Sequence, residues 1–354
     1  MKYLRWLLWP FSLIYGLVVV MRNWCYDVGW FKSVKFSVPV IAVGNLAAGG
    51  AGKSPMTEYL VRLLKDDFKI ATLSRGYGRK TKGFVFATTQ TTANETGDEP
   101  AQFKDKFPDI TVAVCEDRVK GIGQLEADHN LIILDDAYQH RAVTPGLSIL
   151  LFDYNKLAEP NLLLPAGNLR EPLSGKMRAD IIVVSKCPAE LREQQQLEIA
   201  GQLRPYPYQQ LFFSTIHYLP LQQLDGSLAD NVVGGDTTVF LLTGIAGTDL
   251  ITKHLEGYTR NIVHHKYPDH HQFSLKNISK LATDFVASPA LNKVVVTTEK
   301  DAERLKDPAL LQLMAGIEVL VLPINIGFLG EGTQHFNKLI IDYVRKYTTH
   351  SSIH

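Results

Sequence analysis

The chain has 354 residues, of which 45% are hydrophobic and 21% charged, and its formal net charge is +1. This composition is typical of a globular protein long enough for two domains, and it excludes a disordered chain and one that binds nucleic acid through bulk charge. Its three cysteines, Cys25, Cys115 and Cys187, lack a metal-binding spacing, which favours a reducing compartment and argues against structural zinc.

The first predicted element is an apolar N-terminal helix. Residues 6–21 read WLLWPFSLIYGLVVVM, sixteen residues without a charge. A helix of that length reaches about 24 Å, short of the ~30 Å hydrocarbon core of a bilayer. Trp6, Trp9 and Trp24 lie near its ends, where indole rings favour the membrane interface, and no signal-peptide cleavage site follows. We expect a retained membrane-associated helix over residues 1–24, either spanning the bilayer or lying in its interface. A buried helix is the alternative.

A glycine-rich loop, NLAAGGAGKSP at 45–55, follows the apolar run VPVIAVGNL and precedes a segment with helical spacing. The general pattern G-x-x-x-x-G-K-[ST] requires a glycine where this chain has Ala47. Strand, glycine loop and helix are nevertheless the context of a phosphate-binding P-loop, whose backbone N–H groups surround phosphate oxygens. The predicted nucleotide-binding residues are Gly49, Gly50, Ala51, Gly52, Lys53, Ser54 and Pro55. A glycine-rich turn with a solvated lysine is the alternative.

Further apolar runs predict an α/β fold. FKIATLS, ITVAV, LIILDD, LSILLFD and DIIVVSK are typical of buried parallel strands, and helix-like segments separate several of them. The pattern restarts with TTVFLLTGIA, NKVVVTTEKDAERL and IEVLVLPINI, after the polar segment at 224–236. We expect a mostly parallel P-loop domain over residues 25–215 and a smaller α/β domain over residues 216–354.

The run LIILDD ends in two carboxylates, Asp135 and Asp136. A P-loop enzyme needs an acidic residue at the end of a neighbouring strand to hold Mg²⁺, together with the hydroxyl that follows the P-loop lysine. The predicted metal site is therefore Ser54, Asp135 and Asp136. Which aspartate touches the metal stays open, and a pair that only caps a turn is the alternative.

Eight segments carry a resemblance to a known family. They are VGNLAAGGAGKSP (43–55), LSRGYGR (73–79), GDEP (97–100), CEDR (115–118), DDAYQHR (135–141), LLPAGNLREP (163–172), YPDHH (267–271) and TTEKDAERL (297–305). In this order they resemble the blocks of the tetraacyldisaccharide 4′-kinases, the lipid A 4′-kinases of Gram-negative bacteria. That family's loop also lacks the first glycine, so Ala47 fits it. Ala137 departs from the family, which usually has glycine after the aspartate pair.

The resemblance implies a P-loop kinase that uses ATP and Mg²⁺ to phosphorylate the 4′-hydroxyl of a tetraacyldisaccharide 1-phosphate, giving the bis-phosphorylated lipid A precursor, lipid IVA. It implies the cytoplasmic face of the bacterial inner membrane, with the N-terminal segment as anchor. The expected partners are the lipid-linked glucosamine disaccharide, ATP and the membrane, without nucleic acid or an obligatory protein partner. The alternatives are a membrane-tethered ATPase or GTPase switch and a non-catalytic nucleotide-binding scaffold. Acyl-chain preference and oligomeric state stay open.

The resemblance also assigns roles to residues. Asp98 matches the family's base, His270 matches the histidine that pairs with that base, with Asp269 orienting it, and Lys53 is the third catalytic residue. The implied substrate-binding residues are Arg75, Tyr77, Arg118, Gln139, His140, Asn168, Arg170 and Glu171. An ordinary turn aspartate and surface arginines are the alternatives. Thr298 and Asp301 can cap a helix, and Lys300, Asp301 or the segment SKCP at 185–188 can instead lie near the nucleotide base.

Overall fold

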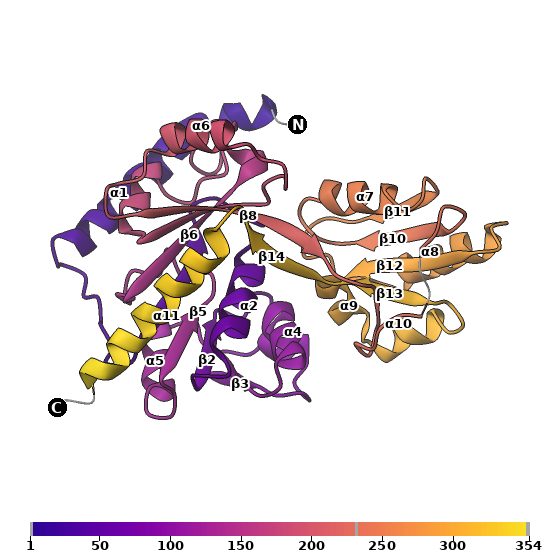
Figure 1. The fold of residues 1–354 in the computed structure, drawn as a ribbon, viewed down its shortest axis with the longest axis horizontal. Helices are drawn as coiled ribbons and strands as arrows, with labels where there is room; N and C mark the ends of the chain where they lie inside the picture. The colour runs from indigo at the N-terminus through magenta and orange to yellow at the C-terminus, as the bar shows by residue number, and fades with distance from the viewer. Residues whose placement is uncertain (1–2, 231–232, 352–354) are drawn as a thin grey trace.

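A computed structural model describes residues 3–230 and 233–351, and it arranges them around two sheets (Figure 1). The larger sheet has nine strands in the order β14-β8-β7-β6-β1-β5-β2-β4-β3, and the smaller has five in the order β11-β10-β12-β13-β9. Residues 3–218 and 324–351 form the large unit, and residues 219–230 and 233–323 form the small unit. The two-sheet α/β architecture expected from the apolar runs is confirmed.

The large sheet is parallel except at its edges. Its strands are β1 (Val40–Asn45), β2 (Ile70–Ser74), β3 (Val85–Ala87), β4 (Thr111–Val114), β5 (Leu131–Leu134), β6 (Leu147–Asp153), β7 (Ile181–Ser185), β8 (Gln210–Tyr218) and β14 (Ile324–Phe328). Neighbours from β8 to β4 pair in parallel, and the edge strands β3 and β14 pair antiparallel. A parallel sheet is covered on both faces, which explains why its central strands read as continuous apolar runs.

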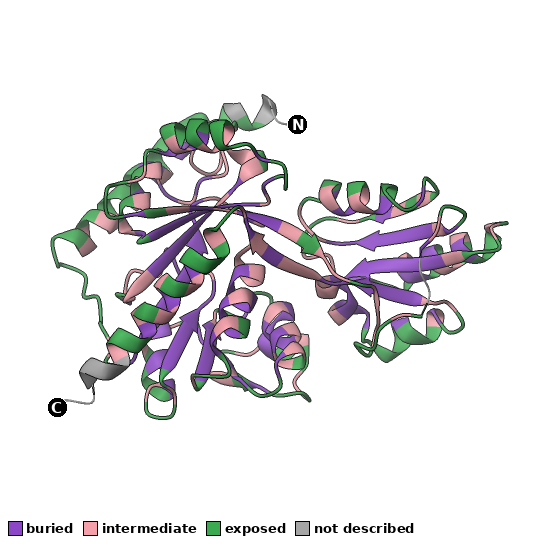
Figure 2. Ribbon diagram, viewed as in Figure 1, coloured by how far each residue is buried: buried purple, intermediate pink, exposed green. Residues whose placement is uncertain are grey.

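Helices cover both faces of this sheet, which is buried through most of its length (Figure 2). The large unit contains α1 (Trp9–Asp27), α2 (Lys53–Leu64), α3 (Ala93–Thr96), α4 (Asp98–Lys106), α5 (Arg118–Leu125), α6 (Glu193–Leu203) and α11 (Gly332–Ser351), with 3₁₀ turns η1 (Tyr3–Leu8), η2 (Tyr154–Lys156) and η3 (Leu173–Arg178). Because strand side chains alternate between faces, Ile41 and Val43 join the core beneath α2 and α11, while Val40 and Ala42 join the core beneath α5.

The small unit repeats this layering on a smaller scale. Its strands are β9 (Gln222–Gln223), β10 (Thr238–Thr243), β11 (Ile262–Lys266), β12 (Lys293–Thr298) and β13 (Val319–Leu322), and its helices are α7 (Asp249–Glu256), α8 (Leu275–Ala287), α9 (Glu299–Leu305) and α10 (Pro308–Leu313). β9 alone among these strands pairs antiparallel. The predicted cap of α9 is present, because the Thr298 hydroxyl accepts a hydrogen bond from the Asp301 N–H at 3.2 Å.

The end of the chain corrects the predicted domain 216–354, of which residues 231–232 and 352–354 lie outside the described residues. β14 pairs with β8 and extends the large sheet, and α11 buries three side chains in the large core. The chain therefore leaves the large unit along β8 and returns along β14. Pro323 divides the single predicted run IEVLVLPINI, so that its first half joins the small sheet and its second half the large one.

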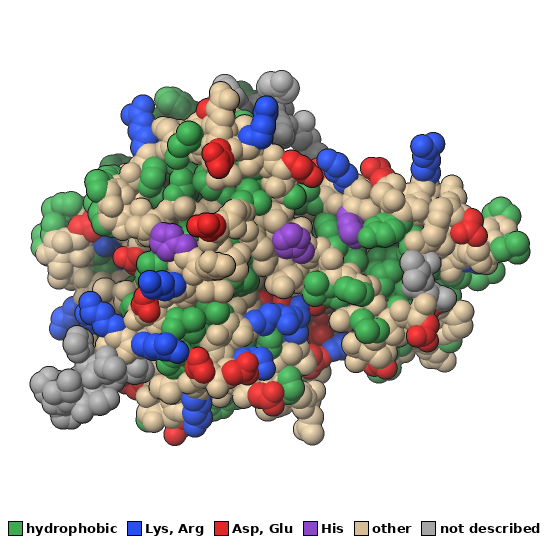
Figure 3. All heavy atoms as spheres, viewed as in Figure 1, with side chains coloured by type: hydrophobic (Ala, Val, Ile, Leu, Met, Phe, Trp, Pro, Cys, Tyr) green, Lys and Arg blue, Asp and Glu red, His purple; other side chains and the backbone are tan. Residues whose placement is uncertain are grey.

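Helix α1 has an unusual distribution of side chains, because its inward face is small or polar. The Ser12 hydroxyl donates to the Leu163 carbonyl at 3.1 Å, the Tyr15 hydroxyl donates to the Arg170 carbonyl at 2.8 Å, and Gly16 packs against Leu163. The outward face is apolar and exposed over Trp9, Phe11, Leu13, Ile14, Leu17, Val18, Val20, Met21 and Trp24. Hydrophobic side chains are visible along this edge of the large unit (Figure 3). None of the helices within the described residues combines the length and hydropathy that crossing a bilayer requires.

Candidate active site

The glycine loop lies between the buried strand β1 and helix α2, as a P-loop requires. Gly49 and Gly52 adopt positive φ angles of 97° and 82°, which favour glycine. A Cβ at position 49 would lie 3.0 Å from the Lys156 ammonium nitrogen, so a side chain there would also be crowded. Gly52 caps the N-terminus of α2, where unpaired backbone N–H groups and the helix dipole favour an anion. The loop therefore has the geometry of a phosphate site.

Lys53 links this loop to the aspartate pair at the end of β5. Its ammonium group lies 3.3 Å from the Asn45 side-chain oxygen and 3.6 Å from Asp136 Oδ1. Arg170 donates through Nη1 to both oxygens of Asp136, at 3.2 Å each. The Thr57 hydroxyl, one turn into α2, donates to Asp135 at 3.2 Å. Two cations and two carboxylates thus meet beside the phosphate site.

The carboxylates indicate where a cation would be favourable. Burial, and then the neighbouring charges of Glu99 and Asp136, raise the pKa of Asp135 to about 7. Carboxylates that repel one another in this way are relieved by a divalent cation, and Mg²⁺ commonly takes only one or two protein ligands. No cluster of three or more His, Cys, Asp and Glu ligands occurs within the described ranges. Of the predicted set, Ser54 and Asp136 line the first cavity and Asp135 lines only the second, so the magnesium site stays a prediction.

Two cavities meet at these residues. The first, of about 430 Å³, lies between the units and is lined by the P-loop, strands β8 and β14, the small-unit loops after β10 and β11, and the start of α9. The second, of about 780 Å³, lies against α1 in the large unit. The residues that line both are Tyr77, Glu99, Asp136, Arg170 and His270. Two molecules bound in these cavities would therefore meet at this junction.

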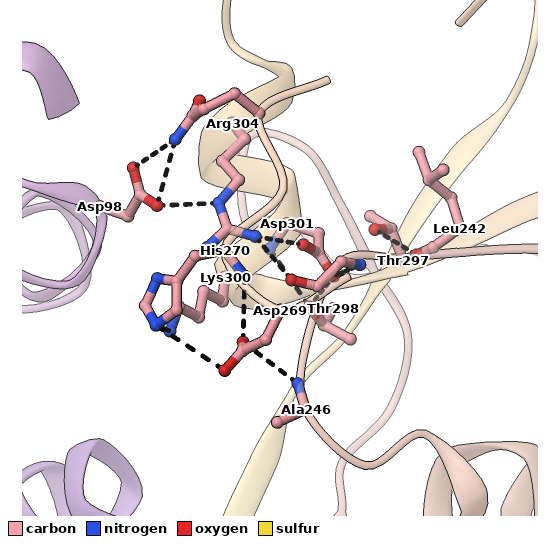
Figure 4. A network of polar contacts seen from close by, with 12 residues as sticks. Asp98, Leu242, Ala246, Asp269, His270, Thr297, Thr298, Lys300, Asp301 and Arg304 are labelled. Atoms are coloured by element: carbon pink, nitrogen blue, oxygen red, sulfur yellow. Dashed lines mark hydrogen bonds and ion pairs between the residues drawn. The ribbon is translucent and has the colours of Figure 1, made fainter. Parts of the chain in front are cut away.

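Asp98 begins α4 and lines the second cavity. The residue before it, Gly97, has a φ of 96°, and a Cβ there would lie 2.8 Å from the Tyr77 carbonyl. Asp98 Oδ2 accepts a hydrogen bond from Arg304 Nε at 2.8 Å, across the boundary between the units (Figure 4). Gln272 Nε2 is more distant, at 3.4 Å from Oδ1. The same amide lies 3.5 Å from Oδ2, so the one short hydrogen bond to the carboxylate is that from Arg304 to Oδ2.

His270 lies at the junction but is not paired with Asp98, which corrects the expected contact. Its Nε2 lies 3.4 Å from the Lys300 ammonium group and 3.9 Å from Asp269 Oδ2 (Figure 4). Its ring is 5.2 Å from that of Tyr77. Burial and then the charge of Lys300 lower the pKa of His270 below its usual value. The predicted contact with Asp269 is present, and the ring is neutral at neutral pH.

Comparison with known proteins identifies the family. The model of the tetraacyldisaccharide-1-P 4′-kinases, LpxK, matches residues 4–345. The chain belongs to the LpxK family. The tetraacyldisaccharide 4′-kinase of Bacteroides thetaiotaomicron is 44% identical over 98% of this chain and 95% of its own length, and that of Flavobacterium johnsoniae is 41% identical over 98% and 99%. LpxK from Aquifex aeolicus, solved in complex with ATP, is 30% identical with a TM-score of 0.74, covering 96% of this chain and 99% of that one.

In this LpxK-family chain, most of the expected substrate-binding residues lie together. The second cavity is lined by Arg75, Tyr77, Arg118, Gln139, His140, Arg170 and Glu171. Asn168 lies outside both cavities, where its side chain accepts a hydrogen bond from Arg5 and donates one to Glu159. Its carbonyl also accepts from the Ala48 N–H at 2.6 Å, so Asn168 supports the P-loop instead of lining the substrate cavity.

Glu171 lines the second cavity, but its carboxylate already has several protein partners. It accepts hydrogen bonds from Arg178 at 2.9 Å, from Gln139 at 3.0 Å and from Asn23 at 3.1 Å. The Gln139 amide also donates to the Asn45 carbonyl at 2.8 Å. These bonds join the end of β1 to helix α1 and give Glu171 and Gln139 a supporting position beneath the cavity.

Four arginines, Arg22, Arg75, Arg118 and Arg170, line the second cavity together with six carboxylates. Burial lowers the pKa of Arg118 to about 10, so this guanidinium remains charged at neutral pH, and its Nε is buried without a protein partner. Burial, and then the charge of Arg118, lowers the pKa of His140 to about 4. A neutral imidazole beside a charged guanidinium makes the part of the cavity around Arg118 and His140 suited to an anion.

Sequence reasoning missed several residues of this site. Tyr15, Val19 and Arg22 from α1 line the second cavity, and their spacing along the chain places them on one helix face. Glu99 forms an ion pair with Lys300 at 2.8 Å. The helical spacing could have revealed the first three, whereas the Glu99–Lys300 pair joins segments about two hundred residues apart and leaves no local signal.

Proposed function

We propose that this chain transfers the γ-phosphoryl group of ATP to the 4′-hydroxyl of a tetraacyldisaccharide 1-phosphate. The observation that carries the proposal is the junction of two cavities at Asp136 and Arg170, one containing the P-loop and the other Asp98. A kinase must bring two different bound molecules into line at one point, whereas a nucleotide switch needs a single pocket. Relatives named tetraacyldisaccharide 4′-kinase, at 41–44% identity over nearly the whole chain, supply the acceptor.

The first cavity suits ATP, which is bound in the Aquifex relative. The P-loop amides would hold the phosphates, and the apolar remainder, including Ile216, Leu250 and Ile324, would take the adenine ring. Ser54 and the aspartate pair would hold Mg²⁺, which would offset the negative charge of the outer phosphates.

The second cavity suits the sugar head of the acceptor, and its residues suggest how the reaction proceeds. Asp98 accepts the proton of the 4′-hydroxyl as the sugar oxygen forms its bond to the γ-phosphorus and the bond from that phosphorus to the β-phosphate oxygen breaks. Lys53 and Arg170 lie where the transferring group would pass and would stabilise its charge. His270, neutral at neutral pH, would position the acceptor hydroxyl or its water.

The deciding experiment follows labelled γ-phosphate from Mg·ATP to a tetraacylated glucosamine disaccharide 1-phosphate in detergent. Label in the lipid that depends on the acceptor is the expected result. If label is released only as free phosphate, at a rate that does not depend on the acceptor, the membrane-tethered ATPase would be established instead. Nucleotide binding without any turnover would establish the scaffold.

The arginines of the second cavity give a prediction about the acceptor's 1-phosphate. Replacing the exposed Arg75 by methionine is expected to raise KM for the acceptor about tenfold and to leave KM for ATP unchanged, because one arginine–phosphate contact contributes roughly 1–2 kcal/mol. Steady-state kinetics on both substrates measures this. Lys80→Met, in the same loop but outside both cavities, is the matched control. An acceptor without its 1-phosphate should be used equally well by wild type and Arg75→Met; a further loss there would contradict the assignment.

We also propose that α1 attaches the enzyme to the cytoplasmic face of the inner membrane, where the acyl chains hold the acceptor. The proposal is supported by the exposed apolar face of α1 and by the opposite face of the same helix, which contributes Tyr15, Val19 and Arg22 to the second cavity. A helix lying in the interface with that orientation would bring the membrane surface to the mouth of the acceptor cavity.

Polar substitutions on α1 test this attachment. The double variant Ile14→Gln/Leu17→Gln is expected to bind phospholipid vesicles at least about tenfold more weakly, because each exposed side chain loses roughly 1.5–3 kcal/mol of apolar burial in the bilayer. Vesicle co-sedimentation measures the change. Val286→Gln/Leu291→Gln, which alters two exposed apolar residues of the small unit, is the control. Equal weakening by both double variants would remove α1 as the attachment site.

A further inference from the structure

Four ion pairs cross from α4 in the large unit to α9 and its C-cap in the small unit, and Figure 3 shows acidic and basic side chains meeting there. They are Asp98–Arg304, Glu99–Lys300, Asp105–Lys306 and Lys106–Glu299. The side chains of the last three pairs are 15–46% exposed. The side chain of Arg304 is 0% exposed, and that of its partner 12%. An exposed pair gains little from its geometry, whereas a buried one is stable only when its geometry is good.

The orientation of Arg304 is set entirely by the small unit (Figure 4). Its Nη1 donates to Asp301 Oδ1 at 2.8 Å and to the Gly244 carbonyl at 2.9 Å. Asp301 is itself fully buried, and its Oδ2 accepts from the Gly244 N–H at 3.0 Å and from the Thr298 hydroxyl at 2.8 Å. Every partner in this chain of bonds belongs to β10, β12, α9 or the loops that follow them. The guanidinium is therefore a fixed feature, to which α4 adds only Asp98.

This contact leaves one oxygen of Asp98 for chemistry. Arg304 Nε donates to Asp98 Oδ2 at 2.8 Å, while the second terminal nitrogen of the guanidinium, Nη2, is buried without a hydrogen-bond partner. The guanidinium thus holds one carboxylate oxygen and not both. The Gln272 amide makes only long contacts, 3.4 Å to Oδ1 and 3.5 Å to Oδ2, and Asp98 lines the second cavity. A carboxylate fixed through one oxygen presents its other oxygen in one direction, which is what a base needs.

We infer that Arg304 is a positioning residue for phosphoryl transfer, which holds Asp98 so that Oδ1 faces the acceptor hydroxyl. The inference rests on the proposed kinase function and on Asp98 as its base. Because the base comes from the large unit and the residue that aligns it from the small unit, the base is aligned only while α9 lies against α4.

Two other roles for the same ion pair make different predictions. If Arg304 only ties the units together, its loss should resemble the loss of Lys306, which pairs with Asp105 across the same boundary. If Arg304 blocks the base, its loss should increase turnover. If Arg304 positions the base, its loss should lower kcat and leave both KM values unchanged. The same substitution should have no further effect once Asp98 has been replaced.

The experiment therefore compares Arg304→Met, Arg304→Lys and Lys306→Met for kcat, for KM of ATP and acceptor, and for thermal unfolding. Arg304→Met is expected to lower kcat about 100-fold with each KM within about threefold of wild type, since misplacing a reacting group costs on that order. Arg304→Lys should recover part of this loss, because the ammonium group can still reach one carboxylate oxygen. Lys306→Met should match wild type. A kcat for Arg304→Met equal to that of Lys306→Met, or above wild type, overturns the inference.

Two further variants keep the test decisive if Arg304→Met folds poorly. Gly244→Ala leaves the charge of Arg304 in place, but its Cβ would lie 3.2 Å from Asp301 Oδ1 and 3.4 Å from Arg304 Nη1, so it should shift the guanidinium and lower kcat. The double variant Asp98→Asn/Arg304→Met should be no slower than Asp98→Asn alone; additive losses of kcat would show that Arg304 acts independently of Asp98.

Absence of lipid phosphorylation in wild type would refute the kinase itself. Normal wild-type transfer, an inactive Asp98→Asn and an unaffected Arg304→Met would refute only this inference.

Discussion

Replacement of Lys53 by methionine is expected to lower phosphoryl transfer by at least about 1,000-fold while the protein remains folded, an effect of the size seen when a transition-state charge partner is lost. Methionine keeps the apolar stem of the lysine and removes its charge. That charge lies 3.6 Å from Asp136 and at the N-terminal end of α2, where it would reach the outer phosphates of the nucleotide. The loss should appear in kcat, because the transferring group carries its charge differently in the transition state than in bound ATP.

The measurement is the labelled transfer assay, with thermal unfolding as the check on folding. Lys65→Met is the matched control, since Lys65 is the C-cap residue of the same helix and pairs with the exposed Asp66. It should retain wild-type kcat. A Lys53→Met enzyme that lost affinity for ATP but kept its kcat would show that Lys53 binds nucleotide without assisting the transfer.

The sequence was sufficient for those features that depend on neighbouring residues. A P-loop is built from consecutive backbone N–H groups, so the local pattern of Gly49, Gly52 and Lys53 was enough to predict it, although Ala47 departs from the general pattern. The strands of a parallel sheet are apolar on both faces, so their runs located β1, β2 and β4–β7 within a few residues. The helix cap at Thr298 and Asp301 was also a local pattern, and it is present.

Features that depend on distant segments could not be predicted in this way. The partner of Asp98 is Arg304, 206 positions along the chain, and the expected partner His270 instead contacts Asp269 and Lys300. Which of several basic side chains reaches a carboxylate is decided by how α9 packs on α4, and no local pattern encodes that packing. The return of β14 and α11 to the large unit could not be predicted for the same reason, because an apolar run indicates a strand but not the sheet that the strand joins.

Asp98→Asn is the second substitution for which we expect a large loss, about 100- to 10,000-fold in kcat, the range found when a general base is removed. Asparagine has the same shape and can still accept a hydrogen bond from Arg304 Nε through its amide oxygen. The position of α4 should therefore be preserved, while the group that accepts the hydroxyl proton is lost. The substitution separates the chemistry of Asp98 from its role in holding the two units together.

The matched control for Asp98→Asn is Asp105→Asn, which lies on the same helix and removes the charge that pairs with Lys306 across the same boundary. If the α4–α9 ion pairs served only to join the units, both substitutions would lower the unfolding temperature and the activity together. If Asp98 is the base, Asp98→Asn alone should lose kcat, with little change in KM for ATP, since the P-loop is untouched. Nearly normal transfer by Asp98→Asn would mean that the acceptor hydroxyl needs no carboxylate, and that charge stabilisation by Lys53 and Arg170 accounts for the reaction.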